Sequence, residues 1–159
     1  MEPDRLRDAL AHHPAAVVVV STTYEGGYRG LTATSFSSVS LDPPLVLVCL
    51  DAMAITREAV IAAGAFNVSV LSRRQEFLAE RFSGLAPVVD PAWREVPHRV
   101  LENGMPIIEG CVGWFQCAIR EVHDGGDHDI VVASVLDAGR EPGEPLVYWD
   151  RGFWRLTTH

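Results

Sequence analysis

Two apolar runs near the N-terminus enclose a polar segment. The runs are "AAVVVV" at residues 15–20 and "LVLVCL" at residues 45–50, and both have the Val and Leu content of buried strands. Between them, residues 30–44 read "GLTATSFSSVSLDPP" and contain six Ser and Thr residues. So many hydroxyls beside an apolar strand are unusual, because a buried hydroxyl without a partner costs about 1–3 kcal/mol.

The rest of the chain alternates short helices with strands. Apolar residues at helical spacing predict helices over residues 4–12, 56–63 and 73–82. Ser72 and Gln75 form a capping-box pattern at the start of the third helix. Strands are predicted at residues 15–23, through the hydroxyl-rich segment, and at residues 43–50, 66–71, 111–122, 130–138, 145–149 and 152–158.

Several strands of unequal length with few, short helices predict a mainly β fold, arranged as an antiparallel barrel. The 159 residues suit a single domain over the whole chain. The strand at residues 43–50 is apolar on both faces and is therefore expected to be central. Residues 85–98 contain three prolines and are expected to form an irregular excursion.

Alternation along the hydroxyl-rich strand places hydroxyls on both of its faces. Small side chains let a backbone approach a flat ligand, and the N–H and C=O groups of a strand edge can bond the polar rim of a heterocycle. A solvated edge strand explains the same residues, and composition alone favours it.

The segment "HDGGDHDIVV" at residues 123–132 combines a turn signal with histidines and carboxylates. Asp124 and Gly125 favour a tight turn, which places His128 at the start of the next strand. A histidine there can donate a hydrogen bond or titrate near neutral pH. The acidic and histidine residues lack a standard zinc or calcium spacing, so a polar turn is favoured over a metal site.

Charge and cysteine content narrow the functional classes. A net charge of −8 and a pI near 5.1 argue against nucleic-acid binding.

Cys111 and Cys117 are expected on one strand roughly 20 Å apart, too far for a disulfide. With Cys49 they are interpreted as buried, reduced thiols of a cytoplasmic protein. The first fourteen residues lack the apolar core of a signal peptide, and no apolar run is long enough to span a bilayer.

Five segments, taken in order, resemble the flavin reductase-like family, the short-chain NAD(P)H:flavin oxidoreductases that serve two-component flavin monooxygenases. The segments are residues 30–44, "FNVSVL" at 66–71, Gln75 with "FSG" at 82–84, "GDH" at 126–128, and "PLVY" at 145–148. The resemblance covers nearly the whole chain. It implies an FMN-binding split barrel, which in this family is usually a homodimer.

The resemblance also implies site residues. His128 would lie near the nicotinamide and assist catalysis by orienting it. Thr56 would offer both its hydroxyl and a helix N-terminus to the flavin phosphate, and it also suits a plain N-cap, a role compatible with the first. Phe82 would close the flavin pocket, although it also suits a core position. The residues implied for flavin binding are Thr32, Ala33, Thr34, Ser35, Ser38, Val39, Ser40, Cys49, Leu50, Asp51, Ala52, Thr56 and Phe82.

The chain departs from the family pattern near the phosphate. Basic residues common in the family are replaced by Asp51, Ala52 and Leu85, and Arg57 is the nearest basic residue that could substitute. FMN, FAD and riboflavin are therefore not ranked by sequence. A pyridoxamine phosphate oxidase-like barrel is disfavoured, because it would need basic phosphate ligands.

The implied activity is hydride transfer from NADH, or NADPH, to FMN or FAD, with reduced flavin supplied to a monooxygenase, by diffusion or by contact. The cofactors supply this chemistry, so the protein needs no Ser-His-Asp or Cys-His arrangement. No "GxGxxG" fingerprint opens a helix, so a Rossmann nicotinamide domain is not expected. The alternative from another class is a non-catalytic flavin- or haem-binding sensor or carrier with the same barrel.

Overall fold

The computed structural model describes residues 1–84 and 93–157, and seven antiparallel strands form its main sheet in the order β3-β2-β6-β9-β10-β5-β4. The elements are α1 (Pro3–Ala11), β1 (Ala15–Ala16), β2 (Val18–Tyr24), β3 (Gly27–Ala33), β4 (Ser37–Leu41), β5 (Pro44–Asp51), α2 (Ile55–Ala63), β6 (Ala65–Val70), α3 (Glu76–Arg81), β7 (His98–Val100), β8 (Pro106–Ile108), β9 (Gly113–Asp124), β10 (His128–Arg140), β11 (Val147–Trp149) and β12 (Gly152–Trp154). The predicted mainly β, antiparallel fold with short helices is confirmed.

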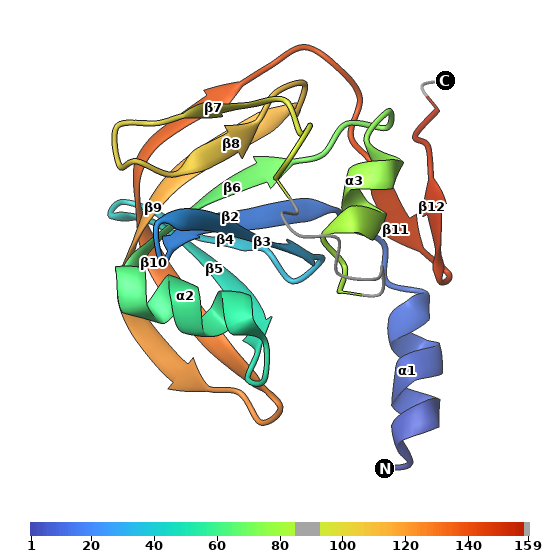
Figure 1. The fold of residues 1–159 in the computed structure, drawn as a ribbon. Helices are drawn as coiled ribbons and strands as arrows, with labels where there is room; N and C mark the ends of the chain where they lie inside the picture. The colour runs from blue at the N-terminus through green and yellow to red at the C-terminus, as the bar shows by residue number, and fades with distance from the viewer. Residues whose placement is uncertain (85–92, 158–159) are drawn as a thin grey trace.

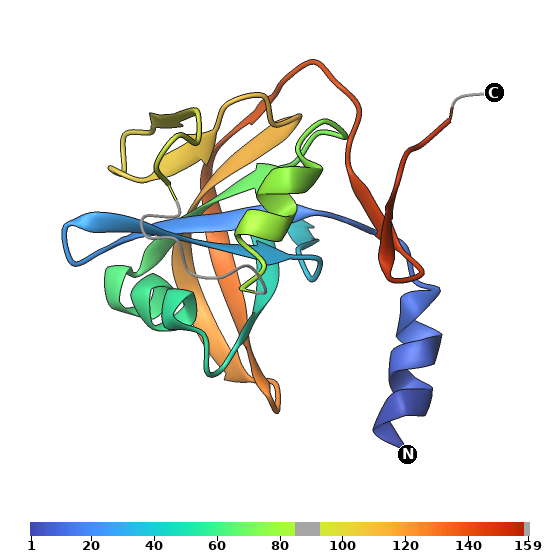
Figure 2. The same ribbon diagram turned by 45° about the vertical axis from the view of Figure 1, so that its right-hand side comes forward.

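The main sheet is strongly curved (Figure 1 and Figure 2). β3 and β5 are separated by four strands in the sheet order, yet they contact each other in space. The sheet therefore bends back towards itself, with apolar side chains and α2 filling its inner side. This inner cluster comprises Val18, Val20, Val46, Val48, Leu50, Val60, Phe66, Val68, Cys117, Val131 and Ala133.

β2 is buried on both faces, which explains its uninterrupted run of valines. Val18 and Val20 belong to the inner cluster, whereas Val17 and Val19 pack in a second cluster with residues of α3. All four side chains are at most 1% exposed. β5 is different, because its buried residues alternate with half-buried ones. β5 is an inner strand, as expected, because it pairs with β10 on one side and β4 on the other, but it lies one place from the edge of the sheet.

The hydroxyl-rich segment forms two strands, not the predicted one. β3 ends at Ala33 and β4 begins at Ser37, and these strands lie at opposite ends of the sheet order. The chain must cross from one edge of the curved sheet to the other, so the strand breaks at residues 34–36. β4 also bulges at Val39, between the pairs that Ser38 and Ser40 make with β5.

The N-terminal caps of α2 and α3 differ from the predicted ones, although α1 begins within one residue of its predicted start. Gln75 Oε1 accepts the N–H of Ser72, and the N–H of Gln75 donates to the Ser72 carbonyl. These bonds close a turn over residues 72–75, so α3 begins at Glu76. The Gln75 half of the predicted capping box is present, but it closes a turn before the helix. α2 begins at Ile55 with Ala54 as its N-cap, so the predicted capping role of Thr56 is wrong.

β1, β11 and β12 form a separate three-stranded sheet beside α1 (Figure 1). α1 has no buried residue. It is held to this sheet by the ion pair between Asp8 and Arg151 and by the Trp149 indole, which donates to the His12 carbonyl at 3.1 Å. The pattern of residues 145–158 predicted strands here but not their separation from the main sheet. The β7–β8 ribbon was not predicted, and the predicted excursion at residues 85–98 lies largely outside the described residues.

All three cysteines are free. Cys117 lies in β9, whereas Cys111 precedes that strand, so the predicted common strand is wrong for Cys111. Both are buried, and Cys49 on β5 is half-buried. Burial raises the pKa of Cys117 to about 12 and also raises the pKa of Cys111. Within residues 1–84 and 93–157, no helix is long and apolar enough to cross a membrane.

We expect at most one cysteine to react quickly with a thiol reagent at pH 8. The reactive species is the thiolate, and the raised pKa values of Cys111 and Cys117 keep them protonated at that pH. Titration with a disulfide reagent should count one fast thiol in native protein and three in urea. Cys49→Ser should remove the fast one, and two or three fast thiols in native protein would contradict the burial.

Candidate functional site

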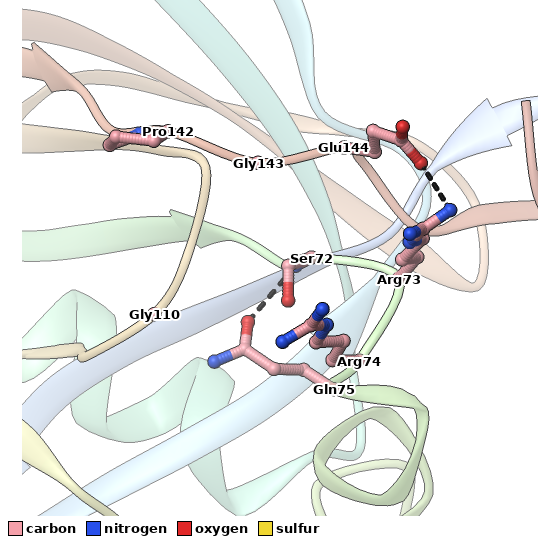
Figure 3. A pocket seen from close by; sticks show the side chains of 8 residues that line it. All are labelled: Ser72, Arg73, Arg74, Gln75, Gly110, Pro142, Gly143 and Glu144. Carbon is pink, nitrogen blue, oxygen red and sulfur yellow. Dashed lines mark hydrogen bonds and ion pairs between the residues drawn. The ribbon is translucent and has the colours of Figure 1, made fainter.

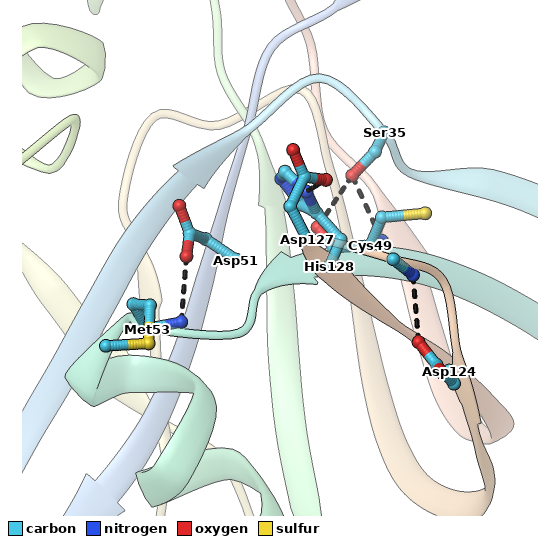
Figure 4. Close-up of polar contacts among 8 residues, drawn as sticks. Ser35, Cys49, Asp51, Met53, Asp124, Asp127 and His128 are labelled. Carbon is cyan, nitrogen blue, oxygen red and sulfur yellow. Dashed lines mark hydrogen bonds and ion pairs between the residues drawn. The ribbon is translucent and has the colours of Figure 1, made fainter.

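The residues implied by the resemblance do not line the cavity that is most clearly formed among the described residues. That cavity lies between residues 72–75, Gly110 and residues 142–144 (Figure 3). Several implied residues gather instead where the β9–β10 hairpin turns and β5 ends (Figure 4). His128 is the register partner of Asp51, and the Ala52 N–H donates to the Asp127 carbonyl at 3.0 Å. The turn between β9 and β10 and the end of β5 are thereby joined.

Ser35 joins the break between β3 and β4 to this region. Its hydroxyl donates to the Cys49 carbonyl at 2.9 Å and accepts the Cys49 N–H at 3.1 Å (Figure 4). β4 pairs with β5 only as far as Leu47. The Ser35 side chain therefore supplies the two hydrogen bonds that a longer β4 would have supplied to Cys49.

The residues around this bond present hydroxyls and small side chains to the surface. Thr34 and Ser38 are exposed, Ser40 is half-buried, and Val39 at the bulge is 48% exposed. β4 is an edge strand, so one row of its backbone N–H and C=O groups lies outside the sheet ladder. This set of exposed donors and acceptors beside small side chains is what a flat, polar-rimmed ring requires.

Other implied residues face inward. The Thr32 hydroxyl donates to the Ala79 carbonyl at 2.7 Å, and the Thr32 N–H donates to the Phe82 carbonyl at 3.0 Å, so Thr32 ties β3 to α3. Phe82 is 3% exposed and packs against Trp93, with ring centroids 4.9 Å apart and the ring planes tilted by 48°. Of the two positions left open for Phe82, the structure has the core position. Ala33 packs against the inner cluster.

Leu50 is fully buried in the inner cluster, so only its backbone can face a ligand. The Thr56 side chain is 7% exposed, and its hydroxyl donates to the Gly30 carbonyl at 3.3 Å. Asp51 is exposed, and its carboxylate accepts the Met53 N–H at 2.8 Å. The loop from β5 to α2 is thus shaped by Asp51, while Thr56 ties α2 to β3.

A hydrogen bond and an ion pair join side chains at the hairpin end. His128 Nδ1 lies 2.7 Å from Asp127 Oδ1, with 43% of the His128 side chain exposed. The hydrogen bond and charge of His128 lower the pKa of Asp127. Arg57 reaches Asp129 with two guanidinium nitrogens, each 2.5 Å from the same carboxylate oxygen. The sequence did not indicate this partner of Arg57, because 72 positions separate the two residues and no local pattern links them.

No group of three or more His, Cys, Asp or Glu side chains is arranged to hold a metal ion in the part of the chain that the structure describes. The carboxylates of the hairpin are used otherwise. Asp124 accepts the Gly126 N–H at 2.9 Å, as in an ordinary turn, and Asp129 is occupied by Arg57.

Comparison with protein families matches residues 10–157 to the flavin reductase like domain. The chain belongs to the flavin reductase-like family. It is 38% identical over 148 residues to the FMN reductase (NADH) RutF of Agrobacterium fabrum, covering 92% of this chain and 84% of the relative. It is 37% identical to the reductase component of 4-hydroxyphenylacetate 3-monooxygenase of Thermus thermophilus, over 96% of both chains.

Solved structures of flavin reductases share the fold. The NADH:FAD oxidoreductase SgcE6 of Streptomyces globisporus C-1027, in complex with NAD and FAD fragments, superposes with a TM-score of 0.91 at 35% identity. The superposition covers 98% of this chain and 93% of that one. The resemblance seen in the sequence motifs is confirmed, as is the assignment of the fold.

Proposed function

We propose that this protein is an NADH-dependent flavin reductase that supplies reduced flavin to a monooxygenase. The observation that carries this proposal is the family match over residues 10–157. Relatives of similar length are named as NADH-dependent FMN or FAD reductases and as monooxygenase reductase components. The cofactors proposed here are accordingly FMN or FAD, with NADH as the reductant.

We place the flavin ring against the break between β3 and β4 and the edge of β4. The exposed hydroxyls of Thr34 and Ser38, the half-buried Ser40 and the exposed Val39 fit a ring with one polar rim and one apolar end. These side chains carry no charge. The N–H and C=O groups on the unpaired edge of β4 add further hydrogen-bond donors and acceptors. We call the surface formed by residues 34–40 the flavin wall. The hydrogen bonds between Ser35 and Cys49 hold the flavin wall in place, and it is supported from the inside of the protein by Thr32, Leu50, Thr56 and Phe82.

We place the flavin phosphate near the start of α2. That helix of nine residues begins without a side-chain cap. The Arg57 N–H donates to the Ala54 carbonyl at 3.1 Å, whereas the N–H groups of Ile55 and Thr56 have no partner among the described residues and can bind an anion. The nearby Arg57 is already paired with Asp129. The positive charge available to the phosphate is therefore reduced, which favours comparable use of FMN, FAD and riboflavin.

The flavin accepts a hydride from NADH, and the protein's task is to bring the two rings together. His128 stands at the start of β10 opposite Asp51, with its Nδ1 facing Asp127. This contact orients the imidazole and leaves Nε2 to meet the nicotinamide. We propose that His128 orients the nicotinamide and does not transfer an essential proton.

The remaining assignments follow the family resemblance. We propose a homodimer in the cytoplasm, with a flavin-dependent monooxygenase as partner and no nucleic-acid or membrane partner. The single domain proposed over residues 1–159 agrees with the family match.

An aerobic assay tests the function. Purified protein with added FMN, FAD or riboflavin should oxidise many equivalents of NADH, and a parallel series with NADPH gives the nicotinamide preference. Spectral evidence of flavin binding without repeated NADH or NADPH consumption would contradict the reductase and indicate a flavin carrier.

Replacing His128 by alanine should lower kcat on the order of tenfold, because a less well oriented nicotinamide reaches the reactive geometry less often. The flavin dissociation constant should change less than about twofold, since the proposed flavin wall is made by other residues. Steady-state NADH oxidation and flavin fluorescence titration measure the two effects. His123→Ala is the matched control, because His123 is exposed and pairs only with Glu121 among the described residues. A His128→Ala rate equal to wild type would refute the role of His128.

A further inference from the structure

The cavity in Figure 3 has a volume of about 440 Å³ and is lined by the turn at residues 72–75, by Gly110 and by the loop at residues 142–144. It lies far from the proposed flavin site. Near the cavity, Gly113 of β9 pairs with Val70 and with Arg140. At the other end of β10, Asp129 pairs with Asp124, so roughly 35 Å of strand separates the two ends. No role assigned above uses this cavity.

The walls of the cavity are fixed by hydrogen bonds. The Gln75 side chain is 7% exposed, and its amide accepts the Ser72 N–H at 2.9 Å and donates to the Glu109 carbonyl at 2.8 Å. Gly110 has a φ of +83° and lies close to the Gln75 side chain. A Cβ at Gly110 would be 3.1 Å from Gln75 Nε2. The Arg73 N–H donates to the Glu144 carbonyl at 2.9 Å, which ties the two loops together. The shape is therefore set before any ligand arrives.

The charge of the cavity is opposite to that of the chain. The charged residues that line the cavity are two consecutive arginines, Arg73 and Arg74, and one carboxylate, Glu144. The whole chain, in contrast, has a net charge of −8. Arg73 pairs with Glu144 at 2.6 Å. Arg74 has no ion-pair or hydrogen-bond partner within residues 1–84 and 93–157, and Figure 3 shows its guanidinium directed towards Ser72 and Gln75. The cavity thus has a net charge of +1, and an unpaired guanidinium supplies it.

We propose that this cavity binds a phosphate group. Arg74 offers its guanidinium N–H groups, and Arg73 retains donors that the single contact with Glu144 does not use. The Ser72 hydroxyl has no partner among the described residues and adds a further donor. Phosphate carries several acceptor oxygens that can engage such donors together, and charged hydrogen bonds of this kind are the strong ones. The phosphate source is either the free ion or a nucleotide monoester.

The test is an NMR titration of the full-length, 15N-labelled protein at low salt, with inorganic phosphate in one arm and adenosine 5′-monophosphate in the other. Amide signals of Arg74, Gln75, Gly110 and Gly143 are expected to shift together. Arg74→Gln should weaken binding about tenfold or more, the loss expected for one charged hydrogen-bonding partner. Arg5→Gln is the matched control, because Arg5 is an exposed arginine on α1 without a partner among the described residues.

Tighter binding in the nucleotide arm, lost in Arg74→Gln, would identify a nucleotide monoester as the ligand. Binding of inorganic phosphate alone, with the same loss, would identify the free ion. The proposal is overturned if neither arm shifts these signals, or if Arg74→Gln binds as tightly as wild type. It is also overturned if added FMN displaces the phosphate and the shifted signals lie at residues 51–56. An unchanged thermal midpoint of Arg74→Gln without phosphate shows that the variant folds.

Discussion

Replacing Gly30 by alanine is expected to lower the free energy of unfolding by about 2 kcal/mol, because the new methyl group has no space. An ideal Cβ at Gly30 would lie 2.8 Å from both Cδ1 and Cε1 of Phe82 and 3.2 Å from Cζ2 of Trp93. Phe82 and Trp93 are 3% and 6% exposed and pack against each other, so neither ring can move into solvent without opening the second cluster. Equilibrium denaturation in urea measures the change.

Gly27→Ala is the matched control for this prediction. Gly27 lies in the same strand, and an ideal Cβ there would have the Tyr24 carbonyl oxygen as its nearest neighbour at 3.8 Å, an ordinary contact distance. This variant should differ from wild type by less than about 0.5 kcal/mol. Equal urea midpoints for Gly30→Ala and wild type would show that β3 and α3 separate more easily than their contacts indicate. Both variants are compared at one protein concentration, since a dimer would make the midpoint concentration-dependent.

Replacing Ser35 by alanine is expected to raise the flavin KM about tenfold and to lower the free energy of unfolding by about 1–2 kcal/mol. The change removes the hydroxyl that bonds both the N–H and the carbonyl of Cys49. β10 lies beside Cys49 on one side, but on the other side no strand is present at this position, because β4 reaches only Leu47. The segment at residues 34–36 would then lose its fixed place beside β5, and the proposed flavin wall would loosen.

The kinetic pattern separates this role from a chemical one. If Ser35 only holds the wall, kcat at saturating flavin should fall less than about threefold while KM rises. Ser37→Ala is the control and should change KM less than about twofold. The exposed Ser37 hydroxyl donates to the adjacent Ser38 carbonyl and has no other partner among the described residues. A Ser35→Ala variant with wild-type KM for every flavin would place the flavin elsewhere.

Much of the fold follows from local pattern. The valine run of β2 and the alternation of β6 predicted strands at nearly the right residues. The alternation did not reveal that both faces of β6 are buried, with Asn67 and Ser69 fully buried beside Phe66 and Val68. The helix predicted over residues 56–63 ends at Ala63, and Gly64 follows it in a left-handed conformation that favours glycine. The start of α3 was displaced because Gln75 bonds Ser72 within a turn, and both a turn and a helix satisfy the same local pattern.

The family, the mainly β class and the segment in which hydroxyls gather could all be predicted before folding was considered, because they depend on residue types at fixed spacing along the chain. What each hydroxyl does became visible in the folded chain alone. Ser35 bonds β5, Thr32 bonds α3, and Thr34 remains exposed, although all three belong to one short segment. The cause is that a side chain's role depends on the strand or helix that lies beside it. That neighbour is set by the curvature of the sheet, which brings β3 against β5 across four intervening strands.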